Sequence, residues 1–329
     1  MSGFEVILPF VRPLEHLLRD PSVTEVMVNL GGRRVFVERA GLVEEIPDLT
    51  IDGPHLAVAI KNIARTCGDE VSAEQPLLDA RLEDGSRVAA MFAPASVDGP
   101  VLTIRKFTRR YGLEDLVGIG TVAPAAAALL CDAVRGRRNV LISGGTGTGK
   151  TTLLNALAAL IPEHERIVLI EETSEVMIDK RNLVRFEAQR AQAALGGEAA
   201  VPAVTIAALL RAALRHRPDR ILVGEVRGAE AFDLLQALNT GHLGSLTTIH
   251  GNSAEQALTR LAHCVVSGNV LLPHASIREA IALAIHLVAH VARDGAQRRL
   301  TEVVGVQGYE AQQDRFVVEH LYTYDAEGG

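Results

Sequence analysis

The sequence predicts an α/β fold, in which a domain built on a parallel sheet follows a smaller α+β domain. Three observations support this prediction. Short apolar runs alternate with helical segments after residue 122, a glycine-rich stretch with a lysine separates one such run from a helix, and the first hundred residues contain paired strands around one helix. Strands that alternate with helices imply right-handed crossovers and a parallel sheet covered by helices on both faces.

Residues 1–107 are predicted to form the α+β domain. Two strands flank the Gly31-Gly32 turn as a hairpin, and the Asp84-Gly85 turn separates two later strands. The expected elements are strands at 24–29 and 33–39, a helix at 55–66, and strands at 77–82, 86–92 and 99–107. Residues 108–121 contain charges and three glycines, and we expect them to connect the two domains.

Residues 122–329 are predicted to form the second domain. Its strands are continuous apolar runs, which is typical of a sheet buried on both faces. We expect helices at 123–135, 151–161, 205–215 and 229–238, and strands at 139–143, 166–170, 220–224 and 245–249. A loop is expected at 191–204, and three antiparallel strands at 286–294, 298–307 and 315–324 are expected at the sheet edge.

Composition excludes several classes of protein. A net charge of −7, 4% aromatic residues and no tryptophan argue against a general nucleic-acid binder, so direct nucleic-acid contact is not expected. The apolar stretches are too short to span a bilayer, and the N-terminus lacks the pattern of an export signal, so we expect a cytoplasmic protein. Three scattered cysteines without Cys-x-x-Cys spacing do not predict a zinc site.

The glycine-rich stretch matches G-x-x-x-x-G-K-[ST] and stands between a predicted strand and a predicted helix. Glycines let a phosphate chain approach backbone N–H groups, and the helix N-terminus adds partial positive charge. Lys150 is expected to bind the β- and γ-phosphates of ATP, and the Thr151 hydroxyl to ligate Mg²⁺. The predicted nucleotide-binding residues are Gly144, Gly145, Thr146, Gly147, Thr148, Gly149, Lys150, Thr151 and Thr152.

Polar residues follow the other predicted parallel strands. Because ligands bind beyond the carboxyl ends of such strands, these residues are expected to meet at one edge. Glu225 is expected to contact the Mg²⁺ shell, and Glu171 to activate the attacking water. His242 and His250 bracket one strand and are expected to sense the γ-phosphate.

Arginines are also expected, because a guanidinium beside the transferring phosphoryl group typically contributes about 10³ to 10⁵ in rate. Arg105 ends the last strand before the connection, and Arg87 follows the Asp84-Gly85 turn. Arg227 lies two residues after Glu225. For each of the three, a solvated surface arginine is the alternative.

Between about residues 20 and 310, these motifs resemble the traffic ATPases of type II and type IV secretion, most of all the conjugative TrbB-type branch. The resemblance implies a RecA-like motor domain and a homo-hexamer at the inner face of the bacterial inner membrane, bound to inner-membrane components of the apparatus. It also implies which residues form the family's functional motifs. These are the phosphate loop, an acidic box (Glu171, Glu172 and Glu175), a second nucleotide motif (Gly224 and Glu225), a histidine box (Gly241, His242 and His250) and the N-terminal Arg105.

The chain departs from the family pattern at two positions. Glu172 stands where the acidic box usually has Asp, and Gly251 stands where the histidine box usually has Ala. Three scattered cysteines also exclude the four-cysteine zinc insertion of some branches.

The expected function is Mg²⁺-ATP hydrolysis that powers pilus assembly or substrate transfer in a conjugative or type IV secretion system. The alternatives are a Tad-type pilus assembly ATPase, a RecA-like DNA helicase or translocase, and an assembly protein that binds ATP without a motor cycle.

Overall fold

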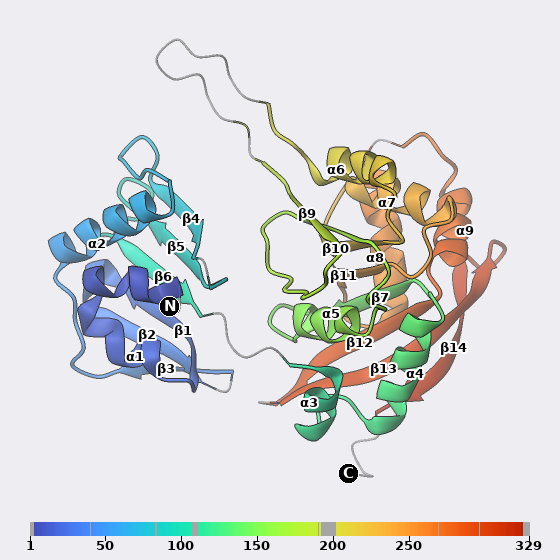
Figure 1. Cartoon of the computed structure of the whole chain (residues 1–329), viewed down its shortest axis with the longest axis horizontal. Coiled ribbons are helices and arrows are strands. Elements are labelled where there is room, and N and C mark those ends of the chain that lie inside the picture. Colours follow the sequence, from blue (N-terminus) through green and yellow to red (C-terminus); the bar gives the residue numbers. More distant parts are fainter. Residues whose placement is uncertain are drawn as a thin grey trace. The chain divides into compact units, whose positions relative to one another are not determined.

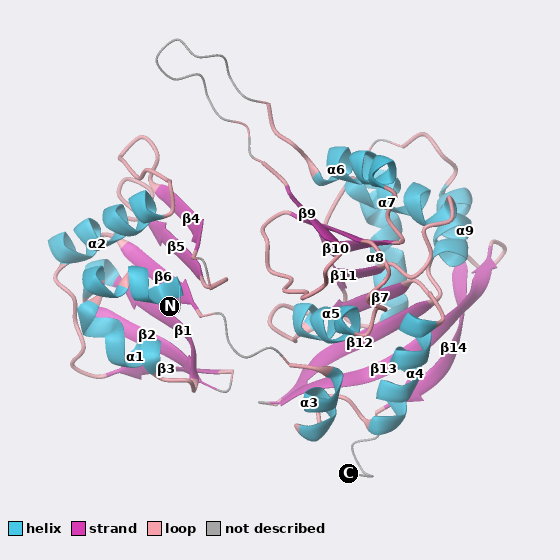
Figure 2. Ribbon diagram, viewed as in Figure 1, coloured by secondary structure: helices cyan, strands magenta, loops and turns pink. Residues whose placement is uncertain are grey.

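The computed structural model describes residues 3–39, 41–82, 84–106, 111–189, 191, 202–268, 270–295 and 297–324. The chain forms two compact units, Met1–Arg109 and Arg110–Gly329. Each contains one sheet packed against helices, as Figures 1 and 2 show. The predicted α/β class is confirmed. Among the described residues, no helix combines the length and hydropathy that a bilayer crossing requires.

The first unit is an antiparallel sheet in the order β3-β2-β1-β6-β5-β4. Its elements are η1 (Gly3–Val6), η2 (Leu8–Phe10), η3 (Arg12–Leu14), α1 (Glu15–Arg19), β1 (Val23–Asn29), η4 (Leu30–Gly32), β2 (Arg34–Arg39), β3 (Leu42–Ile46), α2 (Gly53–Thr66), β4 (Leu77–Arg81), β5 (Arg87–Met91) and β6 (Val101–Arg105). Alternate residues of β4 and β5 are buried, because only one face of the sheet packs against α1 and α2. The expected strands and α2 are present, whereas η1 to α1 and β3 were not predicted.

The second unit has an eight-stranded sheet in the order β14-β13-β12-β7-β11-β10-β8-β9. Its elements are α3 (Leu113–Gly118), α4 (Pro124–Arg135), β7 (Val140–Gly144), α5 (Lys150–Ala159), β8 (Ile167–Glu171), β9 (Leu183–Glu187), α6 (Ile206–Ala213), η5 (Leu214–His216), β10 (Arg220–Val226), α7 (Glu230–Asn239), β11 (Leu246–His250), α8 (Ala254–Ser267), α9 (His274–Ala284), β12 (Leu287–Asp294), β13 (Gln297–Glu310) and β14 (Arg315–Thr323).

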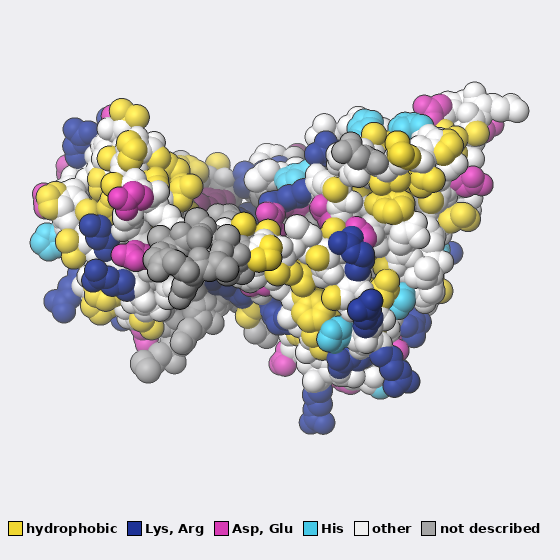
Figure 3. Space-filling view, turned by 90° about the horizontal axis from the view of Figure 1, so that it is seen from above, with side chains coloured by type: hydrophobic (Ala, Val, Ile, Leu, Met, Phe, Trp, Pro, Cys, Tyr) yellow, Lys and Arg dark blue, Asp and Glu magenta, His cyan; other side chains and the backbone are white. Residues whose placement is uncertain are grey.

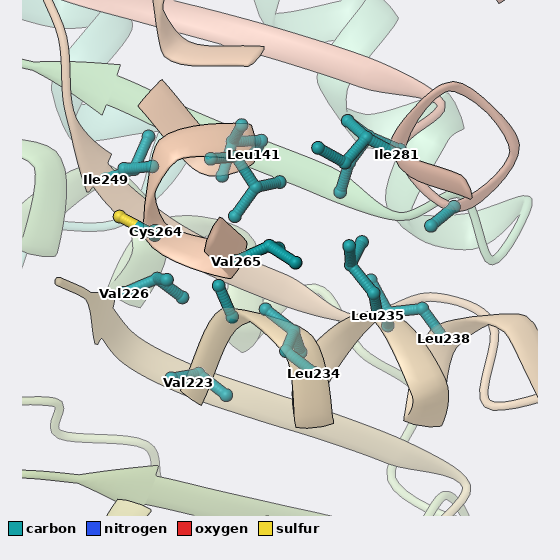
Figure 4. Packing of buried hydrophobic residues seen from close by; sticks show 14 of the residues in the cluster. Leu141, Val223, Val226, Leu234, Leu235, Leu238, Ile249, Cys264, Val265 and Ile281 are labelled. Carbon is teal, nitrogen blue, oxygen red and sulfur yellow. The ribbon is translucent and has the colours of Figure 1, made fainter. Parts of the chain in front are cut away.

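Helices cover both faces of this sheet. One hydrophobic cluster joins α6, α7, α8 and α9 to the strands, and Figure 4 shows part of it, including Leu141, Leu234 and Ile281. A second cluster joins α3, α4 and α5 to the opposite face, where Val140 and Ile142 point. Residues of β7 therefore alternate between two cores, which explains why the strand is a continuous apolar run.

Several features of the second unit differ from the expectations, and α8 and α9 were not predicted. β12 was expected as one of three antiparallel strands; it pairs antiparallel with β13, but its other neighbour, β7, is parallel to it, because α8 and α9 form a crossover between β11 and β12. β13 and β14 are antiparallel at the edge, as predicted. Residues 113–118 of the expected connection form α3, whose Leu116 is buried in the second unit. β9 was not predicted, and residues 192–201 of the expected loop lie outside the described residues, as do 108–110 of the connection.

Candidate nucleotide site

The polar residues at the strand ends come together because their strands are neighbours. β7, β11, β10 and β8 are adjacent and parallel in the sheet. Their carboxyl ends therefore form one edge, with Gly144, His250, Glu225 and Glu171 at or near it. His250 pairs in register with Gly144, which places the end of β11 beside the start of the phosphate loop.

The phosphate loop runs from the last residue of β7 into α5. Gly147 and Gly149 have φ of 69° and 99°, a left-handed conformation that glycine adopts without strain. A Cβ on Gly144 would lie 2.3 Å from the Val291 carbonyl oxygen and 2.6 Å from Thr148 Oγ1. The loop backbone is therefore packed so closely against β12 that glycine is required at this position.

Lys150 begins α5 and is only 8% exposed. Its ammonium group donates to the carbonyl oxygens of Gly144 and Gly145, at 3.1 and 2.8 Å. Burial lowers the pKa of Lys150, and the nearby Glu225 carboxylate opposes that shift. The lysine thus places a cation inside the loop, whereas Thr151 and Thr152 are half-buried in the first turn of the helix.

Glu225 is the centre of a charged cluster at the sheet edge. Arg227 Nε donates to Glu225 Oε2 at 2.6 Å, and His250 Nε2 lies 2.9 Å from Oε1. Arg227 Nη1 also donates to Glu172 Oε2 at 2.9 Å. Burial lowers the pKa of His250, whereas Glu225 acts in the opposite direction. The structure therefore brings four of the predicted groups together: Lys150, Glu225, Arg227 and His250.

Glu171 lies at the same edge but is 3% exposed. Its Oε1 accepts hydrogen bonds from the backbone N–H groups of Glu175 and Val176, both at 2.7 Å. Its Oε2 accepts one from Arg185 Nη2 at 3.3 Å. Oε1 thus holds the loop that follows β8 and Oε2 contacts β9, an arrangement that differs from the expected base with an oxygen directed at water.

His242 is not brought to the phosphate loop of its own subunit. It precedes β11, so it stands at the amino end of the strand that carries His250 at its carboxyl end. A five-residue strand rising about 3.3 Å per residue separates these two ends by about 15 Å. His242 Nδ1 lies 3.1 Å from the Ala237 carbonyl oxygen instead. The structure therefore does not bring His242 to the phosphate loop together with His250.

Arg87 and Arg105 belong to the first unit. They stand directly opposite each other on β5 and β6, and Arg105 also stands opposite Glu25 on β1. Arg87 Nη2 lies 3.4 Å from Asp79 Oδ1. The two arginines are therefore neighbours, an arrangement that their distance in the sequence did not predict.

A buried pair behind the loop was not predicted from the sequence. His290 Nδ1 lies 3.1 Å from Ser143 Oγ, and His290 is 6% exposed. Glu302, opposite His290 on β13, accepts a hydrogen bond from the backbone N–H of Ala254 at 2.6 Å. These contacts tie the end of β7 to β12, and β13 to the start of α8. No local motif signals them, because Ser143 and His290 are 147 residues apart.

Comparison with known proteins adds independent findings. The family model of type II/IV secretion system proteins matches residues 11–322. Conjugal transfer protein TrbB of Rhizobium radiobacter is 35% identical over 308 residues, which cover 92% of this chain and 89% of that protein. Type IV secretion system protein PtlH of Bordetella pertussis is 36% identical over 325 residues, which cover 89% and 93%. The X-ray structure of the Legionella pneumophila ATPase DotB is 20% identical with a TM-score of 0.62, covers 99% of this chain and 82% of its own, and shares the fold.

Proposed function

This chain belongs to the type II/IV secretion system family, and from that membership and the geometry of the site we propose that it hydrolyses Mg²⁺-ATP to drive a conjugative or type IV secretion apparatus. The predicted membership among the traffic ATPases of the TrbB-type branch is confirmed. The observation that carries the proposed activity is the convergence of Lys150, Glu225, Arg227 and His250 beside a loop shaped for phosphate.

The loop fits a phosphate chain. Gly147 and Gly149 are left-handed and put no side chain of their own over the backbone N–H groups, and Gly144 lets the loop pack closely on β12. The N-terminus of α5 and the buried Lys150 ammonium add positive charge. We assign nucleotide binding to the loop from Gly144 to Thr152.

The residues present also fit Mg²⁺. A threonine hydroxyl and a carboxylate are the hard oxygen ligands that this ion prefers, and Thr151 and Glu225 supply them. Thr151 would bind the ion directly and Glu225 through its water shell. When bound, the ion would neutralise charge on the phosphate oxygens.

Glu225 and His250 act on the attacking water in our proposal. Arg227 fixes one carboxylate oxygen of Glu225, and His250 approaches the other. Burial lowers the pKa of His250 and so favours the neutral imidazole, whose two ring nitrogens can donate one hydrogen bond and accept another. Glu171 instead positions the Glu172–Val176 loop through its backbone contacts.

Arg87 and Arg105 remain proposed as arginines delivered to the phosphoryl group by the first unit. Their side-by-side position on β5 and β6 supports a shared role. Arg105→Ala is expected to keep nucleotide affinity and to lose about 10³-fold in turnover. Unchanged turnover would remove Arg105 from the mechanism.

We further propose a homo-hexamer at the cytoplasmic face of the inner membrane, bound to membrane components of the apparatus and without direct contact to nucleic acid. The second unit exposes Leu271, Leu272 and Leu283, and Figure 3 shows hydrophobic side chains gathered on its surface. Gathered exposed hydrophobic side chains mark interaction surfaces, which supports assembly.

The activity is tested by phosphate release from Lys150→Ala and Glu225→Ala. Each is expected to lose about 10²-fold or more in rate, whereas Lys61→Ala, which removes an exposed lysine of α2, is expected to match the wild type. Wild-type rates in both site variants would refute the proposed activity. Complementation of a strain that lacks the gene, scored by transfer, tests the role in secretion with the same three variants.

A further inference from the structure

The hairpin between β12 and β13 overhangs the phosphate loop. β12 runs parallel to β7 with Val291 opposite Gly144, and then continues for three residues beyond the end of β7. The two strands of the hairpin stay paired to its tip, where Asp294 stands opposite Gln297. The hairpin therefore projects past the sheet edge on the side where the loop leaves β7.

Two exposed arginines on this hairpin lie against the loop. Arg293 Nη2 is 3.4 Å from the position that a Cβ on Gly147 would occupy, and Arg298 Cδ is 3.6 Å from that of Gly149. Val291 Cγ2 lies 3.0 Å from the corresponding position on Gly144, and side chains two residues apart share one face of a strand. Arg293 therefore continues the face of β12 that packs on the loop.

The charges of this arrangement favour an anion. Arg293 and Arg298 are directly opposite each other in the antiparallel pair, so both guanidinium groups belong to the same part of the hairpin beside the loop. Lys150 adds a third cation inside the same loop. A phosphate group bound at the loop would accept charge-assisted hydrogen bonds from guanidinium groups placed there.

We propose that Arg293 and Arg298 bind the nucleoside side of the nucleotide: the α-phosphate and the adjoining base. In a loop of this type the backbone N–H groups cradle the α- and β-phosphates, whereas the lysine reaches the β- and γ-phosphates. The arginines lie beside Gly147 and Gly149, which form part of that cradle. A planar guanidinium also stacks on an aromatic base. This inference rests on the proposed nucleotide site, and it makes the hairpin a determinant of affinity for ATP and ADP alike.

The test is a direct titration of a fluorescent ADP and a fluorescent non-hydrolysable ATP analogue, each with Mg²⁺. Arg293→Ala and Arg298→Ala are each expected to raise both dissociation constants by about tenfold, and by the same factor for the two nucleotides. Arg315→Ala is the matched control, since Arg315 is an exposed arginine at the start of β14 that stands opposite Glu310, at the end of β13 away from Arg298. Arg293→Lys, which keeps the charge and loses the planar fork, is expected to give an intermediate value.

The outcomes separate this inference from the proposed function. Wild-type affinity in both alanine variants, or a loss confined to the ATP analogue, would overturn the inference. Lys150→Ala serves as the reference: if it too binds both nucleotides as the wild type does, the nucleotide site itself is refuted. Unfolding temperatures measured without nucleotide show whether a variant has lost its fold. Arg293→Gln and Arg298→Gln, which remove the charge but keep a long polar side chain, are measured in the same way.

Discussion

Glu171→Gln tests whether this carboxylate positions a loop or activates water. The carboxylate is 3% exposed, accepts two backbone hydrogen bonds at 2.7 Å and pairs with Arg185 at 3.3 Å. A glutamine still accepts from the two N–H groups, but it loses their charge assistance and presents an N–H₂ group toward Arg185. Hydrogen bonds to charged groups contribute about 1 kcal/mol more than neutral ones, so these losses together cost about 2 kcal/mol.

For a unit of this size, that cost lowers the unfolding temperature by about 4–8 °C. The assay is thermal unfolding followed by circular dichroism, with phosphate release measured on the same samples. Glu172→Gln is the control, because its side chain is 57% exposed and its substitution is expected to leave the unfolding temperature unchanged. The positioning role is refuted if Glu171→Gln unfolds at the same temperature as the wild type while its turnover falls by about 10²- to 10⁴-fold. That is the result expected for loss of a catalytic base.

Three further outcomes follow from the same structure. Gly144→Ala is expected to abolish nucleotide binding, because its Cβ would lie 2.3 Å from the Val291 oxygen; titration with fluorescent ADP checks this, and wild-type affinity would contradict it. Burial lowers the pKa of His290 below its ordinary value of 6.5, so the unfolded chain binds a proton that the folded protein does not. Stability is therefore complete above that pH and falls as the pH drops below it, and unfolding temperatures at about pH 7.5 and about pH 5.5 should differ less in His290→Gln than in the wild type. Arg220→Leu should lower the free energy of unfolding by about 3–5 kcal/mol, because the buried Glu165 carboxylate loses its hydrogen bonds of 2.6 and 2.9 Å to Arg220. A denaturant titration checks this value. The double variant Arg220→Leu with Glu165→Leu should recover part of the lost stability.

The sequence alone predicted the phosphate loop, the strands on either side of it and the α/β class. These features depend on residues that are contiguous in the chain: the spacing of Gly144, Gly149 and Lys150, and apolar runs of the length of a buried strand. It also predicted that groups from separate strands would meet at one edge, which held for Glu225 and His250.

Tertiary structure decided which of those groups face the loop and what each one contacts. His242 and His250 are eight residues apart, yet they stand at opposite ends of β11, because the strand begins after the first and ends at the second. From the sequence, Glu171 was expected to be a carboxylate at a strand end that activates water. In the structure, the loop after β8 donates a backbone hydrogen bond to it instead. The crossover through α8 and α9 made β12 a parallel neighbour of β7 and so placed Arg293 over Gly147. Strand order and crossovers result from the packing of faces formed by distant segments. A local pattern of residues therefore does not predict them.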